Sequence, residues 1–143
     1  MTVARILAEK GRTVVTVPPD RTIDEAIHIL AEKRIGALIV TDAAGAVIGV
    51  LSERDVMRAL AQDAGSAFDA PVSRYMTSNV VTCERSTTIE DVMTQMTNGR
   101  FRHLPVVEDG ALIGVISIGD VVARRIAAVE AEHQAMRDYI TTA

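Results

Sequence analysis

The chain has 143 residues, of which 48% are hydrophobic and only 3% aromatic, and its formal net charge is −4 at pH 7. This size and apolar content suffice for one compact domain with an aliphatic core, whereas the acidic balance argues against binding of nucleic acid, which depends on clustered basic side chains. The single cysteine, Cys83, excludes an intrachain disulfide and favours a reducing compartment.

The first half of the chain predicts alternating helices and strands. Apolar residues at helical spacing mark the helices, runs of β-branched residues mark the strands, and Gly or Pro separates them. In chain order we expect an amphipathic helix over residues 3–10, a strand over 13–17, a helix from Asp20 or Thr22 to about residue 33, strands over 37–41 and 47–51, a helix over 54–64 and a linker over 65–70.

The second half predicts the same order of elements. We expect an apolar segment within residues 71–78, a strand over 80–82, a helix over 88–98, strands over 103–107 and 112–117, and a longer helix from Gly119 onward. The N-terminal residues lack the apolar core of a signal peptide, and no stretch reaches the length of a membrane span. The sequence therefore predicts a cytoplasmic protein without a membrane partner.

The two halves are copies of one unit. The segment GAVIGVLSERD at residues 45–55 returns as GALIGVISIGD at residues 110–120. Upstream, a constant offset aligns Thr16, Thr22, Ile23, Arg34 and Val40 with Thr82, Thr88, Ile89, Arg100 and Val106. We therefore expect an α/β (α+β) fold of two tandem β-α-β-β-α repeats, residues 1–70 and 71–143, that pack as a pseudo-two-fold pair.

Each copy ends on an aliphatic run that closes with Ser-x-x-Asp, at Ser52 to Asp55 and at Ser117 to Asp120. The pattern predicts a strand that leads directly into the first turn of a helix, where free N–H groups and the helix dipole favour an anion. Ser-x-x-Asp is also an ordinary capping pattern, so taken singly it is compatible with a purely structural role.

The whole repeated pattern resembles the cystathionine-β-synthase (CBS) domain family, and the pair resembles a Bateman module. The pattern comprises a Thr, then Thr-Ile followed by two acids, a helix, an apolar strand, a turn, a Gly-aliphatic run and Ser-x-x-Asp, and it spans about residues 12–125. The resemblance implies a stand-alone regulatory protein of bacterial type with two related ligand clefts between the repeats. Each cleft would take an adenosine-containing ligand, with AMP or NAD(H) ahead of ATP, ADP or S-adenosylmethionine.

The resemblance also implies roles for particular residues. Asp55 and Asp120 would accept hydrogen bonds from ribose hydroxyls, and Ser52 and Ser117 would contact ribose or phosphate. Phosphate would be held by Arg100, Arg102 and His103, with Arg54 within reach, because Arg makes paired charge-assisted hydrogen bonds. The adenine pocket would be formed by Thr16, Thr82, the strand start Ala37, Leu38 and Ile39, and the strand start His103, Leu104 and Pro105.

The two clefts are expected to differ in charge. Gly36 and Ala37 stand in the first repeat where Arg102 and His103 stand in the second, and Glu53-Arg54 corresponds to Ile118-Gly119. One cleft should therefore bind the more highly charged ligand, or the same ligand more tightly. The sequence leaves open which cleft receives Arg102 and His103.

No constellation typical of an enzyme is present in the sequence. Cys83 has no histidine neighbour, neither serine lies in a Gly-x-Ser-x-Gly elbow, and there is no Walker or dinucleotide-fold glycine loop. Nor does any His, Cys or carboxylate cluster have metal-ligand spacing. We therefore expect no enzymatic activity, and two function classes remain: a nucleotide-sensing regulatory module that acts on an unidentified partner protein, or a dimerisation and partner-binding module that needs no ligand.

The last helix carries an apolar seam that needs a partner. The seam residues alternate in spacing between four and three, and they are Val122, Ile126, Val129, His133, Met136 and Ile140. We expect this seam to pack against another subunit or against the N-terminal segment of the same chain. Together with the apolar sheet faces, it predicts a homodimer.

Overall fold

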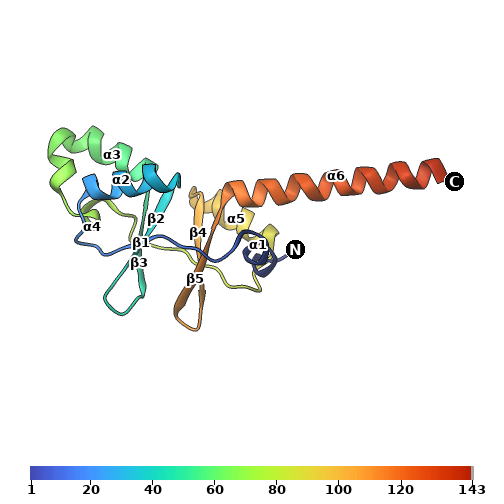
Figure 1. The fold of residues 1–143 in the computed structure, drawn as a ribbon, viewed down its shortest axis with the longest axis horizontal. Coiled ribbons are helices and arrows are strands. Elements are labelled where there is room, and N and C mark those ends of the chain that lie inside the picture. The colour runs from blue at the N-terminus through green and yellow to red at the C-terminus, as the bar shows by residue number, and fades with distance from the viewer. Residues whose placement is uncertain (143) are drawn as a thin grey trace.

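The computed structural model describes residues 1–142 and contains two similar halves that lie side by side (Figure 1). The first half comprises α1 (Val3–Lys10), β1 (Thr16–Val17), α2 (Ile23–Lys33), β2 (Ala37–Thr41), β3 (Val47–Ser52), α3 (Glu53–Asp63) and the 3-10 helix η1 (Ala64–Asp69). The second half comprises α4 (Val72–Tyr75), α5 (Ile89–Gly99), β4 (His103–Glu108), β5 (Ala111–Ser117) and α6 (Ile118–Thr142). The expected α/β fold with two repeats is confirmed.

Helices α2 and α5, which occupy equivalent places in the two halves, begin and end in the same way. The hydroxyl of Thr22 accepts a hydrogen bond from the Glu25 amide at the start of α2, and Thr88 caps the Asp91 amide at the start of α5. Both helices end on an arginine in the left-handed conformation, Arg34 with φ 54° and Arg100 with φ 56°. The repeated sequence thus produces a repeated local structure.

The sheets differ between the halves. β1 pairs with β2 in parallel and β2 with β3 antiparallel, whereas β4 and β5 form a two-stranded antiparallel sheet. The expected strand over residues 13–17 is limited to β1, and the expected strand over 80–82 is wrong. Only Cys83 bridges to Val106, with the Cys83 amide donating to the Pro105 carbonyl at 2.9 Å and the Val107 amide donating to the Cys83 carbonyl at 2.9 Å.

The expected linker over residues 65–70 is also wrong. Most of it belongs to the 3-10 helix η1, which contacts both α2 and α3. Ala67 is fully buried and Ala70 is 5% exposed, because small side chains let this turn approach the helices closely. A composition typical of loops therefore serves close packing here.

The hydrophobic core consists of two clusters, one in each half, and each cluster receives side chains from a short helix of the other repeat. The short helix that precedes each repeat packs in the core of the other one. From α1, the buried residues Val3, Ile6 and Leu7 join the cluster of α5, β4 and β5, and Val72 from α4 joins the cluster of α2, β2 and β3. This exchange ties the two halves into one unit.

Equivalent glycines make room for these crossing helices. A Cβ added at Gly114 in β5 would lie 2.6 Å from Leu7 Cδ2, and one added at Gly49 in β3 would overlap the side chain of Met76. With a methyl group at either position, the side chain or the strand would have to shift. Close packing therefore favours glycine at Gly49 and Gly114.

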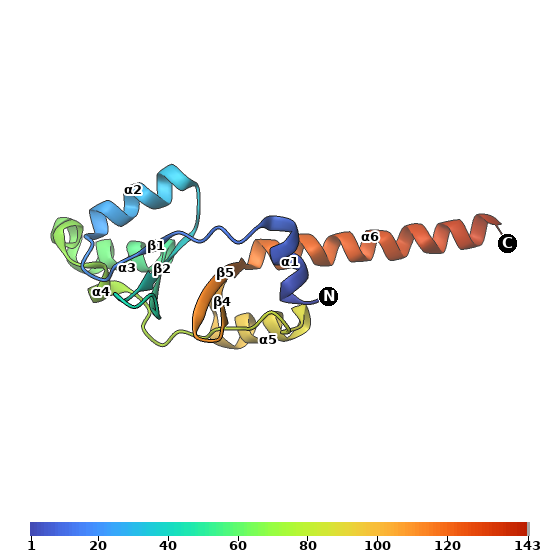
Figure 2. The same cartoon turned by 60° about the horizontal axis from the view of Figure 1, so that its bottom comes forward.

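Helix α6 leaves the rest of the molecule soon after it begins, as both views show (Figures 1 and 2). An ion pair between Glu9 and Arg124 joins α1 to its first turns. Beyond them the seam is open: Val129 is 40% exposed, Met136 60% and Ile140 67%. The alternative that the seam packs against the N-terminal segment is therefore wrong. Within residues 1–142, no helix combines the length and apolar character needed to cross a membrane.

Candidate functional site

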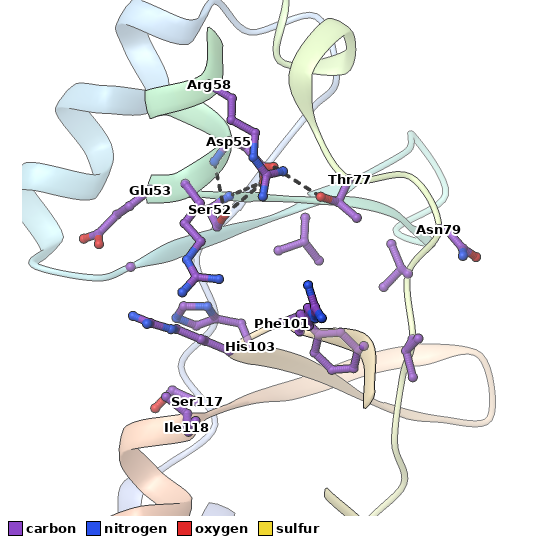
Figure 3. A pocket seen from close by; sticks show the side chains of 18 of the residues that line it. Ser52, Glu53, Asp55, Arg58, Thr77, Asn79, Phe101, His103, Ser117 and Ile118 are labelled. Atoms are coloured by element: carbon purple, nitrogen blue, oxygen red, sulfur yellow. Dashed lines mark hydrogen bonds and ion pairs between the residues drawn. The ribbon is translucent and has the colours of Figure 1, made fainter. Parts of the chain in front are cut away.

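A cavity of about 680 Å³ lies between the two halves (Figure 3). It is bounded by the start of β2, the junction of β3 and α3, the segment after α4, the end of α5 with the start of β4, and the junction of β5 and α6. The lining residues are Gly36, Val50, Ser52, Glu53, Arg54, Asp55, Arg58, Thr77, Asn79, Val80, Val81, Gly99, Arg100, Phe101, Arg102, His103, Ser117, Ile118 and Gly119. Its size is within the range of small-molecule sites.

Ser52 and Asp55 form a reciprocal capping box at the first turn of α3. The Ser52 hydroxyl accepts from the Asp55 amide at 3.3 Å, and Asp55 Oδ2 accepts from the Ser52 amide at 2.8 Å and from Ser52 Oγ at 3.0 Å. Asp55 Oδ1 accepts from Thr77 Oγ1 at 3.3 Å, which ties the segment after α4 to this helix start. Asp55 is 5% exposed and is among the residues that line the cavity, and a carboxylate oxygen can accept more than one hydrogen bond.

Four arginines surround the cavity. Arg54 and Arg58 come from successive turns of α3, Arg100 is the left-handed residue after α5, and Arg102 lies directly before β4. Arg58 Nη1 lies 3.6 Å from Asp55 Oδ1. The acidic side chains of the lining are Glu53 and Asp55. The balance of the lining is positive, in contrast to the acidic chain as a whole.

His103 lies against the first half of the chain at the start of β4. A Cβ added at Gly36 would lie 3.1 Å from His103 Nε2, so the imidazole packs tightly against this glycine. Burial lowers the pKa of His103 below its usual value; Glu53 and Asp120 oppose this shift, while Lys10 and Arg102 reinforce it. The imidazole is therefore neutral at pH 7.

Apolar side chains form the remaining wall, and none of them was among the site residues predicted from the sequence. They are Val50 of β3, Val80 and Val81 before Cys83, Phe101 before β4, and Ile118 at the start of α6. Residues 80–82 carry the composition of a strand, but Val80 and Val81 face this space instead of pairing in a sheet. Arg58 was also not predicted as a site residue, although its position one turn after Arg54 places it on the same face of α3.

Seven predicted site residues line this cavity: Ser52, Arg54, Asp55, Arg100, Arg102, His103 and Ser117. Eight do not: Thr16, Ala37, Leu38, Ile39, Thr82, Leu104, Pro105 and Asp120. The strand positions among the eight are taken up by packing, since Leu38 and Leu104 are fully buried and Ile39 is 1% exposed. Thr16 lines a separate depression beside the two hairpin turns, together with Gly45 and Gly110.

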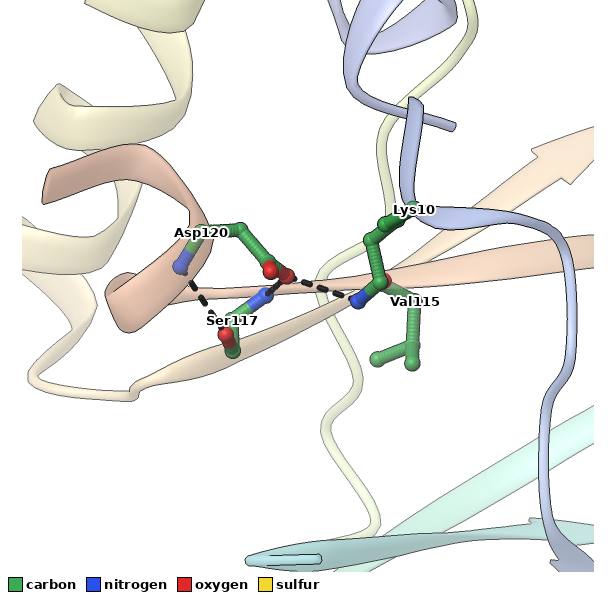
Figure 4. Close-up of polar contacts among 4 residues, drawn as sticks. All are labelled: Lys10, Val115, Ser117 and Asp120. Atoms are coloured by element: carbon green, nitrogen blue, oxygen red, sulfur yellow. Dashed lines mark hydrogen bonds and ion pairs between the residues drawn. The ribbon is translucent and has the colours of Figure 1, made fainter. Parts of the chain in front are cut away.

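Asp120 has a different environment from its counterpart Asp55. Its Oδ2 accepts from Lys10 Nζ at 2.7 Å and from the Ser117 amide at 2.9 Å, and Lys10 also donates to the Val115 carbonyl at 3.0 Å (Figure 4). Burial raises the pKa of Asp120, but the bonds from Lys10 and Ser117 outweigh this effect, so the net pKa is below its usual value. In the second half the carboxylate is thus already paired with an ammonium group.

Cys83 has the properties of a packing residue. It is 4% exposed, and desolvation by burial, with a smaller contribution from Glu84, raises the pKa of its thiol to about 12. A thiol with so high a pKa is a poor nucleophile at neutral pH.

Comparison with known proteins agrees with the arrangement of two repeats. The sequence model of the CBS domain matches twice, over residues 5–62 and 72–126. The crystal structure of the CBS-domain containing protein ATU1752 from Agrobacterium tumefaciens is 49% identical, covers 87% of this chain and 99% of its own, and superimposes with a TM-score of 0.85.

Two further similar structures contain adenosine ligands. The CBS domain protein PAE2072 from Pyrobaculum aerophilum, in complex with AMP, is 30% identical, with 84% of this chain and 89% of its own covered and a TM-score of 0.75. The CBS domain pair of protein MJ0100, in complex with 5′-methylthioadenosine and S-adenosyl-L-methionine, is 26% identical, with coverages of 90% and 97% and a TM-score of 0.78. Among curated relatives, the chain spans 65% of a 17.7 kDa protein from Acidianus ambivalens and 22% of an Arabidopsis thaliana CBS domain-containing protein.

Proposed function

The chain belongs to the CBS domain family, and on that premise we propose that it is a regulatory module that binds an adenine nucleotide, AMP or NAD(H) first, in the cavity between its halves. The observation that carries the proposal is the lining of this cavity. Four arginines and the first turn of a helix can bind a phosphate, a buried carboxylate can accept hydrogen bonds from a ribose, and an apolar wall can contact a base.

Within this proposal each part of the nucleotide has its own contacts. Asp55 Oδ1 accepts a ribose hydroxyl, either beside Thr77 or in its place. Arg102 and Arg54 bind the phosphate together with Arg100. The base lies between Phe101 and the valines of the wall, which replaces the adenine pocket expected at the buried strand starts.

The charge of the lining favours some adenosine ligands over others. Paired hydrogen bonds from arginine suit a phosphate, which AMP, NAD(H), ADP and ATP carry. 5′-Methylthioadenosine has no phosphate, and the sulfonium cation of S-adenosylmethionine would be repelled by the arginines. We therefore rank these two compounds last for this chain, although they are ligands of the MJ0100 pair.

We further propose that the two clefts are unequal and that the Ser52–Asp55 cleft is the stronger. Arg54, Arg58, Arg100 and Arg102 line the cavity of that cleft, where their charges favour a phosphate. At Asp120, Lys10 and the Ser117 amide both bind Oδ2, so the charge of the carboxylate is already compensated by an ammonium group. We expect this ion pair to weaken the hydrogen bond that Asp120 would accept from a ribose hydroxyl.

We also propose that the chain forms a homodimer, because the apolar seam residues of α6 are exposed within the single chain. Output would then pass through a change in assembly or through a partner protein. The alternative, a dimerisation or partner-binding module without a ligand, is supported by the capping boxes at Ser52 and Ser117, which account for the Ser-x-x-Asp pattern without a nucleotide.

Thermal shift and calorimetry with a panel of ligands test the proposal. The panel contains AMP, NAD⁺, NADH, ATP, 5′-methylthioadenosine, S-adenosylmethionine and GMP, added to protein from which any copurified nucleotide has been removed. We expect AMP or NAD(H) to raise the melting temperature most, GMP to leave it unchanged, and no ligand to be hydrolysed. If none of the adenine compounds binds, the proposal fails and the ligand-free alternative replaces it.

A further inference from the structure

The free part of α6 has the sequence of a coiled-coil helix. Its seam residues, Val122 to Ile140 as defined above, occupy alternating d and a positions of a heptad over almost three repeats. The apolar seam residues are between 40% and 67% exposed within the chain. An apolar stripe of this length on a projecting helix needs a second helix to cover it.

The charges beside the seam distinguish the ways in which a second copy could cover it. Arg125 and Glu132 occupy g positions, and Glu130 and Arg137 occupy e positions. In a parallel pair of helices in register, each g residue faces the e residue five positions further along the partner. Arg125 then faces the partner's Glu130, and Glu132 faces the partner's Arg137, so every such pair joins opposite charges.

An antiparallel pair has no equally good arrangement. When the two seams overlap fully, e faces e and g faces g, which brings Glu130 against the partner's Glu130 and Glu132 against the partner's Glu132. A shift by one heptad toward the C-terminus removes this repulsion but leaves Val122 and Ile126 uncovered. From this charge pattern we infer that α6 forms a parallel, in-register coiled coil with α6 of a second copy of this chain.

The surroundings of α6 agree with a parallel pair. Such a pair brings the two globular parts together at the same end, where α5 contacts α6 and Met93 of α5 is 39% exposed. Arg125 lies 4.0 Å from Glu90 of its own chain, a long contact between two exposed groups that leaves the guanidinium able to reach a partner.

His133 has a special place in this arrangement. As an a residue it faces the partner's His133 in the middle of the seam, and a polar residue at one a position fixes the register of a coiled coil at a cost in stability. We therefore expect His133→Ile to tighten the dimer but to admit staggered or higher assemblies, whereas His133→Asn should keep a single register.

Cysteine substitution tests the direction of the helices, because the native Cys83 is buried and does not interfere. In the parallel register, Met136→Cys lies opposite its own copy and should form a disulfide-linked dimer under mild oxidation. In the fully overlapped antiparallel register, residue 136 lies opposite residue 126 and cannot. The control is Gln134→Cys, which lies on the outer face of the helix and should not link. If Met136→Cys stays unlinked, or links no faster than Gln134→Cys, the inference is overturned.

A charge swap provides the second test. Glu132→Lys should raise the dissociation constant of the dimer about tenfold in low salt, and Glu132→Lys combined with Arg137→Glu should restore it. The inference rests on the proposed homodimer, and light scattering shows whether the dimer itself or only the pairing of the α6 helices fails. A monomer at micromolar concentration refutes the dimer as a whole, while a dimer without the charge effect refutes only the helix pairing. Nucleotide binding by either variant should be unchanged.

Discussion

Arg34 and Arg100 occupy equivalent positions, each directly after a helix and each in the left-handed conformation. Only Arg100 lines the cavity. Replacement by alanine should therefore cost both variants similar stability, since the backbone change is the same. Calorimetry with AMP should show a loss of about one to two decades in affinity for Arg100→Ala, and little change for Arg34→Ala. Equal affinities in the two variants would remove Arg100 from the phosphate site.

His103 should make the stability of the protein depend on pH. Its pKa in the folded chain is lowered by burial, so the unfolded chain binds more protons as the pH falls below the ordinary histidine value of about 6.5. Stability from this residue is thus present above that pH and is lost as the pH falls toward the folded pKa. Thermal melts between pH 8 and 5.5 should show a steeper decline for the wild type than for His103→Gln. Parallel curves would contradict this assignment.

The sequence identified the residues of the site better than it identified their neighbours. Ser52, Asp55 and the run from Arg100 to His103 could be predicted because they belong to repeated or clearly basic patterns. The pairing of Lys10 with Asp120 could not, because it joins residues 110 positions apart through the exchange of α1. Phe101 and Val81 were not predicted for a similar reason. Whether a short apolar segment faces the core or the cavity depends on contacts with the other half of the chain.

At the scale of elements, the repeat fixed the helices and the paired strands closely, while the irregular segments required tertiary structure. Residues 65–70 have the composition of a linker, yet Ala67 is fully buried in η1. Residues 80–82 have the composition of a strand, but pairing begins only at Cys83. In both segments, contacts with distant elements outweigh local preference.

The contact between α1 and β5 should be sensitive to a methyl group at Gly114. Gly114→Ala should destabilise the fold by about 1–3 kcal/mol, because the added methyl group collides with Leu7 in a packed core. Gly65→Ala is the matched control, since nothing lies within 4 Å of a Cβ at that position. Urea denaturation monitored by circular dichroism gives both values. Equal stabilities of the two variants would mean that Gly114 is not required by packing.

In the molecule as a whole, the exchange of α1 and α4 joins the two halves that line the cavity. The cavity draws on both halves, and Thr77, which bonds Asp55, follows the helix that packs in the first half. A nucleotide in this cavity would therefore contact both repeats and the segment that joins them.

We propose that an adenine nucleotide occupies the cleft of Asp55 in preference to that of Asp120. Asp55→Asn and Asp120→Asn change equivalent capping residues, so each variant serves as the control for the other. Both variants should be titrated with AMP by calorimetry. We expect Asp55→Asn to lose the high-affinity site and Asp120→Asn to retain it. Equal isotherms for the two variants, or unchanged binding in both, would refute this preference.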